Sequence, residues 1–135
     1  MIKIYSKINP EELLHVVFRG NDINETRQDV SPNEEFLQVS TFSLEYGKTF
    51  RPHKHIPCEK LVTITQECWI ILTGHVKVSY YDTDGTFIQD VVLASHDVTI
   101  TFRGGHTYTS LADDTKIYEV KNGPYNGQQA DKVFI

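Results

Sequence analysis

The chain has 135 residues, of which 39% are hydrophobic and 23% are charged, and its formal net charge is −5. This length suits one domain with its own core, and an acidic balance without any basic run argues against nucleic acid and anionic membrane surfaces as partners. The sequence has no apolar stretch of about 18 residues and no signal-peptide pattern, so we expect a cytoplasmic protein that does not enter a membrane.

The first part of the chain, residues 1–35, has an irregular pattern. Residues 2–5 are expected to form a short strand. A helix-capping residue precedes proline at positions 10 and 32, which predicts one or two helical turns at each place. We therefore expect residues 1–35 to be an N-terminal extension that packs on a domain formed by residues 36–135.

From residue 36 onward the pattern is that of short strands separated by turns. The expected strands are 36–46, 50–56, 67–81, 87–93, 98–102, 106–111 and 115–121. Short strands at regular spacing, without a long helical period, are typical of an all-β sandwich or barrel.

Three histidines and one carboxylate lie on three of these strands. His53 and His55 are two residues apart, so both side chains point to the same face of a strand. Glu67 begins the next strand, and His106 follows a Gly-Gly turn. Imidazole suits Zn, Fe and Ni, and a carboxylate extends the range to Mn. The set therefore predicts one divalent transition-metal ion, against the alternative that each histidine only fills a core or surface position.

The same residues resemble the two sequence motifs of the cupin superfamily. Gly47 is followed after five residues by His53-x-His55, Glu67 is followed after six residues by Gly74, and His106 stands where the second motif places its histidine. The resemblance covers roughly residues 36–121. It implies an all-β double-stranded β-helix (a jelly roll, the cupin barrel) with a metal held by His53, His55, Glu67 and His106.

The chain departs from the family pattern between the histidine pair and the glutamate. Eleven residues separate His55 from Glu67, which is longer than in the family. Glu59 lies at the usual distance and is therefore a rival metal ligand, or a general base at the site. Residues 56–66 are expected to form either a lid at the barrel mouth or an additional edge strand. The β-forming run at residues 61–65 favours the edge strand.

Alternation along the strands adds candidates for the pocket. Arg51 shares the face of the histidine pair, where its planar guanidinium could bind a carboxylate or phosphate, and Trp69 shares the face of Glu67. Tyr108 shares the face of His106 and could donate a proton, although a core position is the favoured interpretation of its ring. We assign Arg51 and Trp69 to substrate binding, and Glu59 and Tyr108 to catalysis.

The resemblance implies a metal-dependent isomerase or epimerase that acts on a small sugar-like, polar or anionic metabolite. The chain is similar to small single-domain cupins that accompany polysaccharide and sugar-nucleotide synthesis. An Fe(II)-dependent dioxygenase and a non-catalytic ligand-binding or sensing cupin remain as alternatives. If no metal is bound, the chain would be of the metal-free ketoisomerase type, with histidines as acid and base. An apolar outer face on strand 67–73 predicts contact with a second subunit, so we expect a homodimer.

Overall fold

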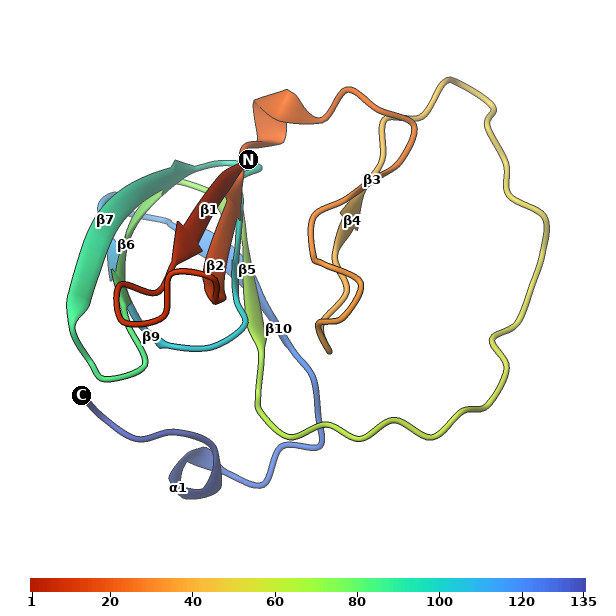
Figure 1. Ribbon diagram of the computed structural model, residues 1–135. Coiled ribbons are helices and arrows are strands. Elements are labelled where there is room, and N and C mark those ends of the chain that lie inside the picture. Colours follow the sequence, from red (N-terminus) through yellow and green to blue (C-terminus); the bar gives the residue numbers. More distant parts are fainter.

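The structure is a computed structural model that describes all residues, 1–135, and it is mainly β. Its curved strands gather on one side of the molecule, and a long loop swings out on the other side (Figure 1). The expectation of a mainly β protein is confirmed. None of the helices has the length and apolar character needed to cross a membrane.

The structure contains ten strands, one short 3-10 helix and one short α-helix. The strands are β1 (Ile2–Tyr5), β2 (Leu13–Phe18), β3 (Gln28–Asp29), β4 (Ser40–Thr41), β5 (Glu67–Thr73), β6 (His75–Tyr81), β7 (Phe87–Ala94), β8 (Val98–Thr101), β9 (Gly105–Ser110) and β10 (Lys116–Lys121). The 3-10 helix η1 spans Gly20–Asp22, and α1 spans Gln128–Asp131.

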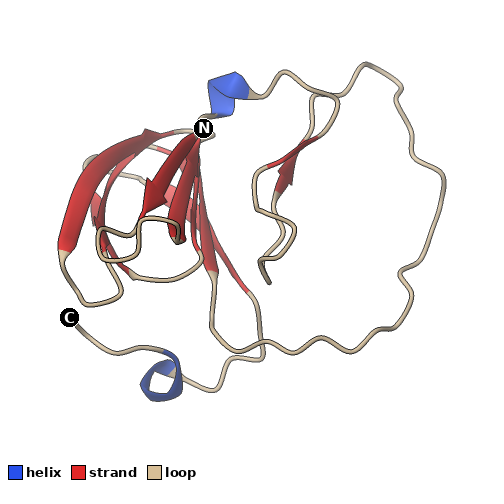
Figure 2. Ribbon diagram, in the orientation of Figure 1, coloured by secondary structure: helices blue, strands red, loops and turns tan.

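The strands form two main antiparallel sheets that face each other. The larger sheet has the order β1-β2-β8-β5-β10, and the smaller sheet has the order β7-β6-β9. A separate two-stranded ribbon, β3-β4, lies beside them (Figure 2). Within the sheets β9 pairs only with β6, and β10 pairs only with β5. Each of these two strands therefore has one unpaired edge.

Two apolar clusters stabilise this arrangement. The cluster between the sheets contains Ile4, Val17, Ile71, Val76, Val78, Tyr80 and Leu93. The other lies on the outer face of the larger sheet, where Val30 and Leu37 cover Cys68. At Cys68, the face that was expected to contact a second subunit is thus covered by residues of the same chain.

The N-terminal region is more regular than its sequence suggested. The strand expected at residues 2–5 is confirmed as β1. A helical turn was expected after Asn9, but residues 9–11 form a turn that leads directly into β2. This strand is stabilised because it pairs with β8 and buries Val16 and Phe18. Both N-terminal strands are therefore part of the larger sheet.

Residues 42–66 contain no helix and no strand, and we call them the long loop. A strand was expected at residues 50–56, and the structure does not have one. No other strand pairs with this stretch. Pro52 and Pro57 also lack the N–H group that a central strand must donate. The long loop leaves the ribbon after β4 and returns to the larger sheet at β5 (Figure 1).

Candidate acid–base site

Glu67 and His106 meet between the two sheets. Glu67 begins β5, His106 is the second residue of β9, and the distance from His106 Nε2 to Glu67 Oε1 is 3.4 Å. An ionised carboxylate can only accept a hydrogen bond, so this pairing favours the proton on Nε2. The other ring nitrogen, Nδ1, is buried without a hydrogen-bond partner.

Glu67 is held as an anion by its neighbours. Lys121 Nζ lies 3.0 Å from Glu67 Oε2, and the Trp69 indole N–H donates a 2.8 Å hydrogen bond to Oε1. Burial alone raises the pKa of Glu67, but hydrogen bonds and positive charge from His106 and Lys121 outweigh this effect and lower the pKa to about 2. A carboxylate this acidic is a weak proton acceptor. Its contribution is to orient the imidazole.

Tyr108 lies beside the histidine on the same face of β9. Its ring stacks on Trp69 with the centroids 3.5 Å apart and an interplanar angle of 4°, and the His106 ring centroid is 5.0 Å away. Burial, reinforced by the charge of Glu67, raises the pKa of Tyr108 well above its ordinary value. The phenol therefore stays protonated. Its hydroxyl is buried and has no hydrogen-bond partner.

The polar groups behind this site are all paired. His15 Nδ1 lies 3.0 Å from the Thr101 hydroxyl, and the Tyr80 hydroxyl lies 2.6 Å from that of Thr99. Burial lowers the pKa of His15 to about 4, so its ring is neutral. This layer has no free donor or acceptor to offer a ligand, in contrast to His106 and Tyr108.

Four of the residues expected at the site lie on the long loop instead. Arg51, His53, His55 and Glu59 are exposed there. The two histidine rings have their centroids 5.5 Å apart, and His53 Nδ1 is 3.0 Å from the Arg51 carbonyl oxygen. No group of three or more His, Cys, Asp or Glu side chains is arranged to hold a metal ion. The structure thus brings together Glu67, Trp69, His106 and Tyr108, and leaves the histidine pair apart from them.

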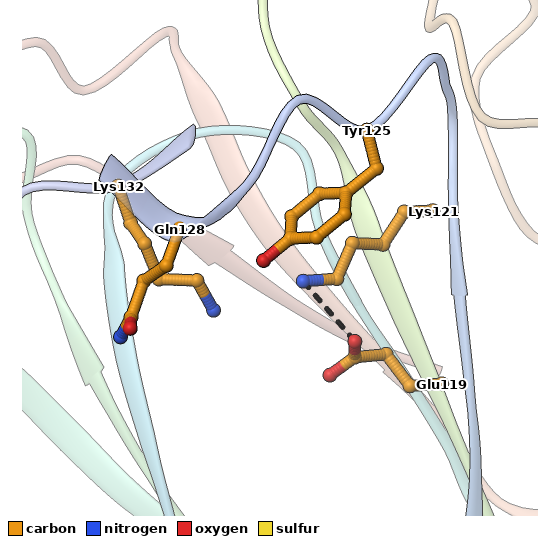
Figure 3. Close-up of a pocket in the computed structure, with 5 residues that line it drawn as sticks. All are labelled: Glu119, Lys121, Tyr125, Gln128 and Lys132. Atoms are coloured by element: carbon orange, nitrogen blue, oxygen red, sulfur yellow. Dashed lines mark ion pairs between the residues drawn. The ribbon is translucent and has the colours of Figure 1, made fainter. Parts of the chain in front are cut away.

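A cavity of about 410 Å³ lies next to Lys121. It is lined by Glu119, Lys121, Tyr125, Gln128 and Lys132 (Figure 3). Sequence reasoning missed all five. The alternation of Glu119 and Lys121 at the end of β10 was the available signal, because residues two apart share one face of a strand.

The side chains at the site offer an imidazole, a protonated phenol, an oriented carboxylate and an ammonium group within one region between the sheets. These are the groups needed to move a proton on a small polar molecule. Comparison with protein-family models, curated proteins and solved structures finds no match to the chain.

Proposed function

We propose that this protein is an isomerase or epimerase that binds a small sugar-like or otherwise polar metabolite between its sheets and moves a proton on it. The observation that carries this proposal is the pair of unpartnered buried atoms on β9, His106 Nδ1 and the Tyr108 hydroxyl oxygen. A buried polar group without a partner costs about 1–3 kcal/mol, so two of them on one strand face indicate that a ligand supplies the missing partners.

The chemistry follows from the pairing of His106 Nε2 with Glu67 and from the protonated phenol of Tyr108. Glu67 keeps the proton of His106 on Nε2, so Nδ1 can accept a proton from a carbon next to a carbonyl group. The Tyr108 hydroxyl donates a hydrogen bond to the carbonyl oxygen, where negative charge develops. The imidazolium then returns the proton. Return to the former carbonyl carbon, with the proton of the hydroxyl on the first carbon passing to the former carbonyl oxygen, gives an isomer. Return to the first carbon, after the intermediate has turned over in the site, gives an epimer.

Proton exchange in heavy water tests this proposal. The protein is incubated with a panel of aldoses, ketoses and their phosphates, and loss of C–H signals is followed by NMR. We expect exchange with the wild type and a decrease of about 10²- to 10⁴-fold in His106→Gln, with a clear decrease in Tyr108→Phe. His75→Gln, at an exposed position on β6, is the matched control. Exchange that survives in His106→Gln, or its absence from the whole panel, would contradict the proposal.

A second candidate function is binding of a divalent metal by His53, His55, Glu67 and His106, with Glu59 as the rival carboxylate. As arranged here these residues do not fit one metal ion, because the donors form two separate pairs and the Lys121 ammonium is already bound to Glu67. What favours the candidate is the free edge of β9, the strand that carries His106. Pairing of residues 50–56 with that edge would extend the smaller sheet toward a jelly roll.

Measurement of the metal bound to wild type and variants tests this candidate function. Wild type, His53→Ala, His106→Ala and the control His75→Ala are each exposed to Zn, Mn, Fe or Ni and then analysed for bound metal. The candidate predicts near-stoichiometric metal in wild type and control, and its loss in both other variants. Bound iron with substrate-dependent O₂ uptake would select a dioxygenase, and ligand binding without turnover would select a sensing module. Wild type without metal would leave only the acid–base proposal.

A further inference from the structure

The C-terminal strap, residues 122–135, runs back over the end of the sheets where Glu67 lies. Asn122 holds its beginning, because its side chain accepts a 2.6 Å hydrogen bond from the Gln66 N–H and donates a 3.0 Å bond to the Ile64 carbonyl. Further along, Asp131 accepts a hydrogen bond of 2.5 Å from the Thr65 hydroxyl. The strap is therefore tied to the chain segment that leads directly into β5.

The end of the strap reaches β9. Ile135 lies so close to Gly105 that a side chain at that glycine would collide with it. Gly105 directly precedes His106, so the strap spans from β10 to the strand that carries the proposed base. The cavity of about 410 Å³ lies between this strap and β10 (Figure 3).

The two lysines at the cavity differ, because one takes part in ion pairs and the other does not. The Lys121 ammonium is neutralised by three carboxylates, because it lies 3.0 Å from Glu67, 3.1 Å from Glu119 and 3.8 Å from Asp131. Lys132 also lines the cavity but takes part in none of the ion pairs of the structure. Its ammonium is exposed and is available to pair with an anion in a space of the size that small ligands occupy.

We propose that this cavity binds a small hydroxyl-bearing anion, whose charged group pairs with Lys132 and whose hydroxyls bond to Glu119 and Gln128. The ring of Tyr125 is exposed, and its centroid lies 5.8 Å from Lys121 Nζ. This ring forms a flat wall for the C–H face of such a molecule. The inference rests on the proposed function in one respect: Lys121 lines the cavity and lies 3.0 Å from Glu67, so a ligand bound there lies next to the partner of His106.

The only tryptophan of the chain reports on this cavity. The Trp69 indole N–H donates hydrogen bonds to Glu67 at 2.8 Å and to Glu119 at 3.0 Å. A ligand that bonds to Glu119 changes the surroundings of the indole. Tryptophan emission therefore measures binding directly and needs no turnover.

The test is a titration of wild type, Lys132→Gln, Tyr125→Ala and Lys116→Gln with glucose 1-phosphate, glucuronate and glucose, followed by Trp69 emission and by calorimetry. Lys116 is an exposed lysine on β10 outside the cavity and is the matched control. We expect both anions to bind about tenfold more tightly than glucose, and Lys132→Gln to remove that advantage while Lys116→Gln keeps it. The stronger of the two anions identifies the charged group as phosphate or carboxylate.

Failure of this inference is distinguishable from failure of the proposed function. Absence of binding by all three probes, glucose binding as tightly as the anions, or an unchanged affinity in Lys132→Gln would overturn the inference. Proton exchange that depends on His106 would still support the acid–base proposal in that case. Conversely, anion binding that depends on Lys132, without any proton exchange, would uphold the inference and contradict the proposed enzyme.

Discussion

The strands between residues 67 and 121 and the long loop, residues 42–66, both carry many strand-forming residues, yet only the first region is folded into sheets. Ile71 of β5 is 0% exposed, whereas Ile56 of the long loop is 87% exposed. Every strand from β5 to β10 pairs with at least one other strand, and no strand pairs with the long loop. The difference shows that strand formation depends on a partner edge and on burial as much as on residue type.

The two regions also divide the expected site between them. The sheets supply Glu67 and His106, and the long loop supplies His53 and His55. The acid–base proposal needs only the sheets, whereas the metal candidate needs both regions. Experiments that separate the behaviour of the two regions therefore also bear on the function.

The largest expected difference between the regions is in proteolysis. We expect trypsin to cleave after Lys48, Lys54 or Lys60 at least about 10³-fold faster than after Lys77 of β6, because sites in the sheets are cut only after the domain opens. Mass spectrometry of early fragments checks this. First cuts within the sheets would contradict it, and slower cutting of the long loop on addition of metal would favour the metal candidate.

Truncation of one isoleucine in each region should give the next largest difference, which is in the free energy of unfolding. Ile71→Ala removes a fully buried side chain between the sheets and should lower the free energy of unfolding by about 2–5 kcal/mol. Ile56→Ala should change it by no more than about 0.5 kcal/mol, since the side chain lies in solvent. Urea denaturation of both variants measures these values. A large effect of Ile56→Ala would show that the long loop packs against the sheets.

The buried imidazole of the sheets should make stability depend on pH. Burial holds the pKa of His15 at about 4, below the value of 6.5 for an unburied group. Between these values the unfolded chain binds the additional proton. Stability should therefore fall as the pH drops from 6.5 to 4, by on the order of 3 kcal/mol. Chemical denaturation of wild type and His15→Gln across this range is the check, and an equally steep slope in the variant would contradict the assignment.

Substitution of one glycine in each region should give the smallest difference in stability. Gly74, between β5 and β6, has a φ of 79°, and a side chain there would meet Thr115. Gly47 on the long loop has a φ of 77° but open space around it. Gly47→Ala should cost about 1 kcal/mol from the backbone alone, and Gly74→Ala more than that. Thermal melting compares the two, and equal losses would mean that Thr115 moves away without cost.

The residue pattern was sufficient for much of the fold. It predicted the mainly β class, and it placed β1 and the strands from β7 to β10 close to their observed positions. It predicted one strand over residues 67–81, which the structure divides at Gly74 into β5 and β6 of different sheets. Alternation within strands correctly predicted that Trp69 shares a face with Glu67, and Tyr108 with His106. These features are local, since they follow from the two-residue period of a strand and from turn residues.

Contacts between distant residues were decided only by the tertiary structure. Lys121 meets Glu67 across two paired strands, and Lys132 reaches the cavity through the C-terminal strap. The residues next to these lysines in the sequence give no signal that the lysines make these long-range contacts. The stretch 50–56 shows the reverse case, because it has a strand-like pattern but no neighbour that accepts its hydrogen bonds. Local pattern determines which residues can form a strand. Which strands pair, and which side chains meet, depends on the free energy of burying them together.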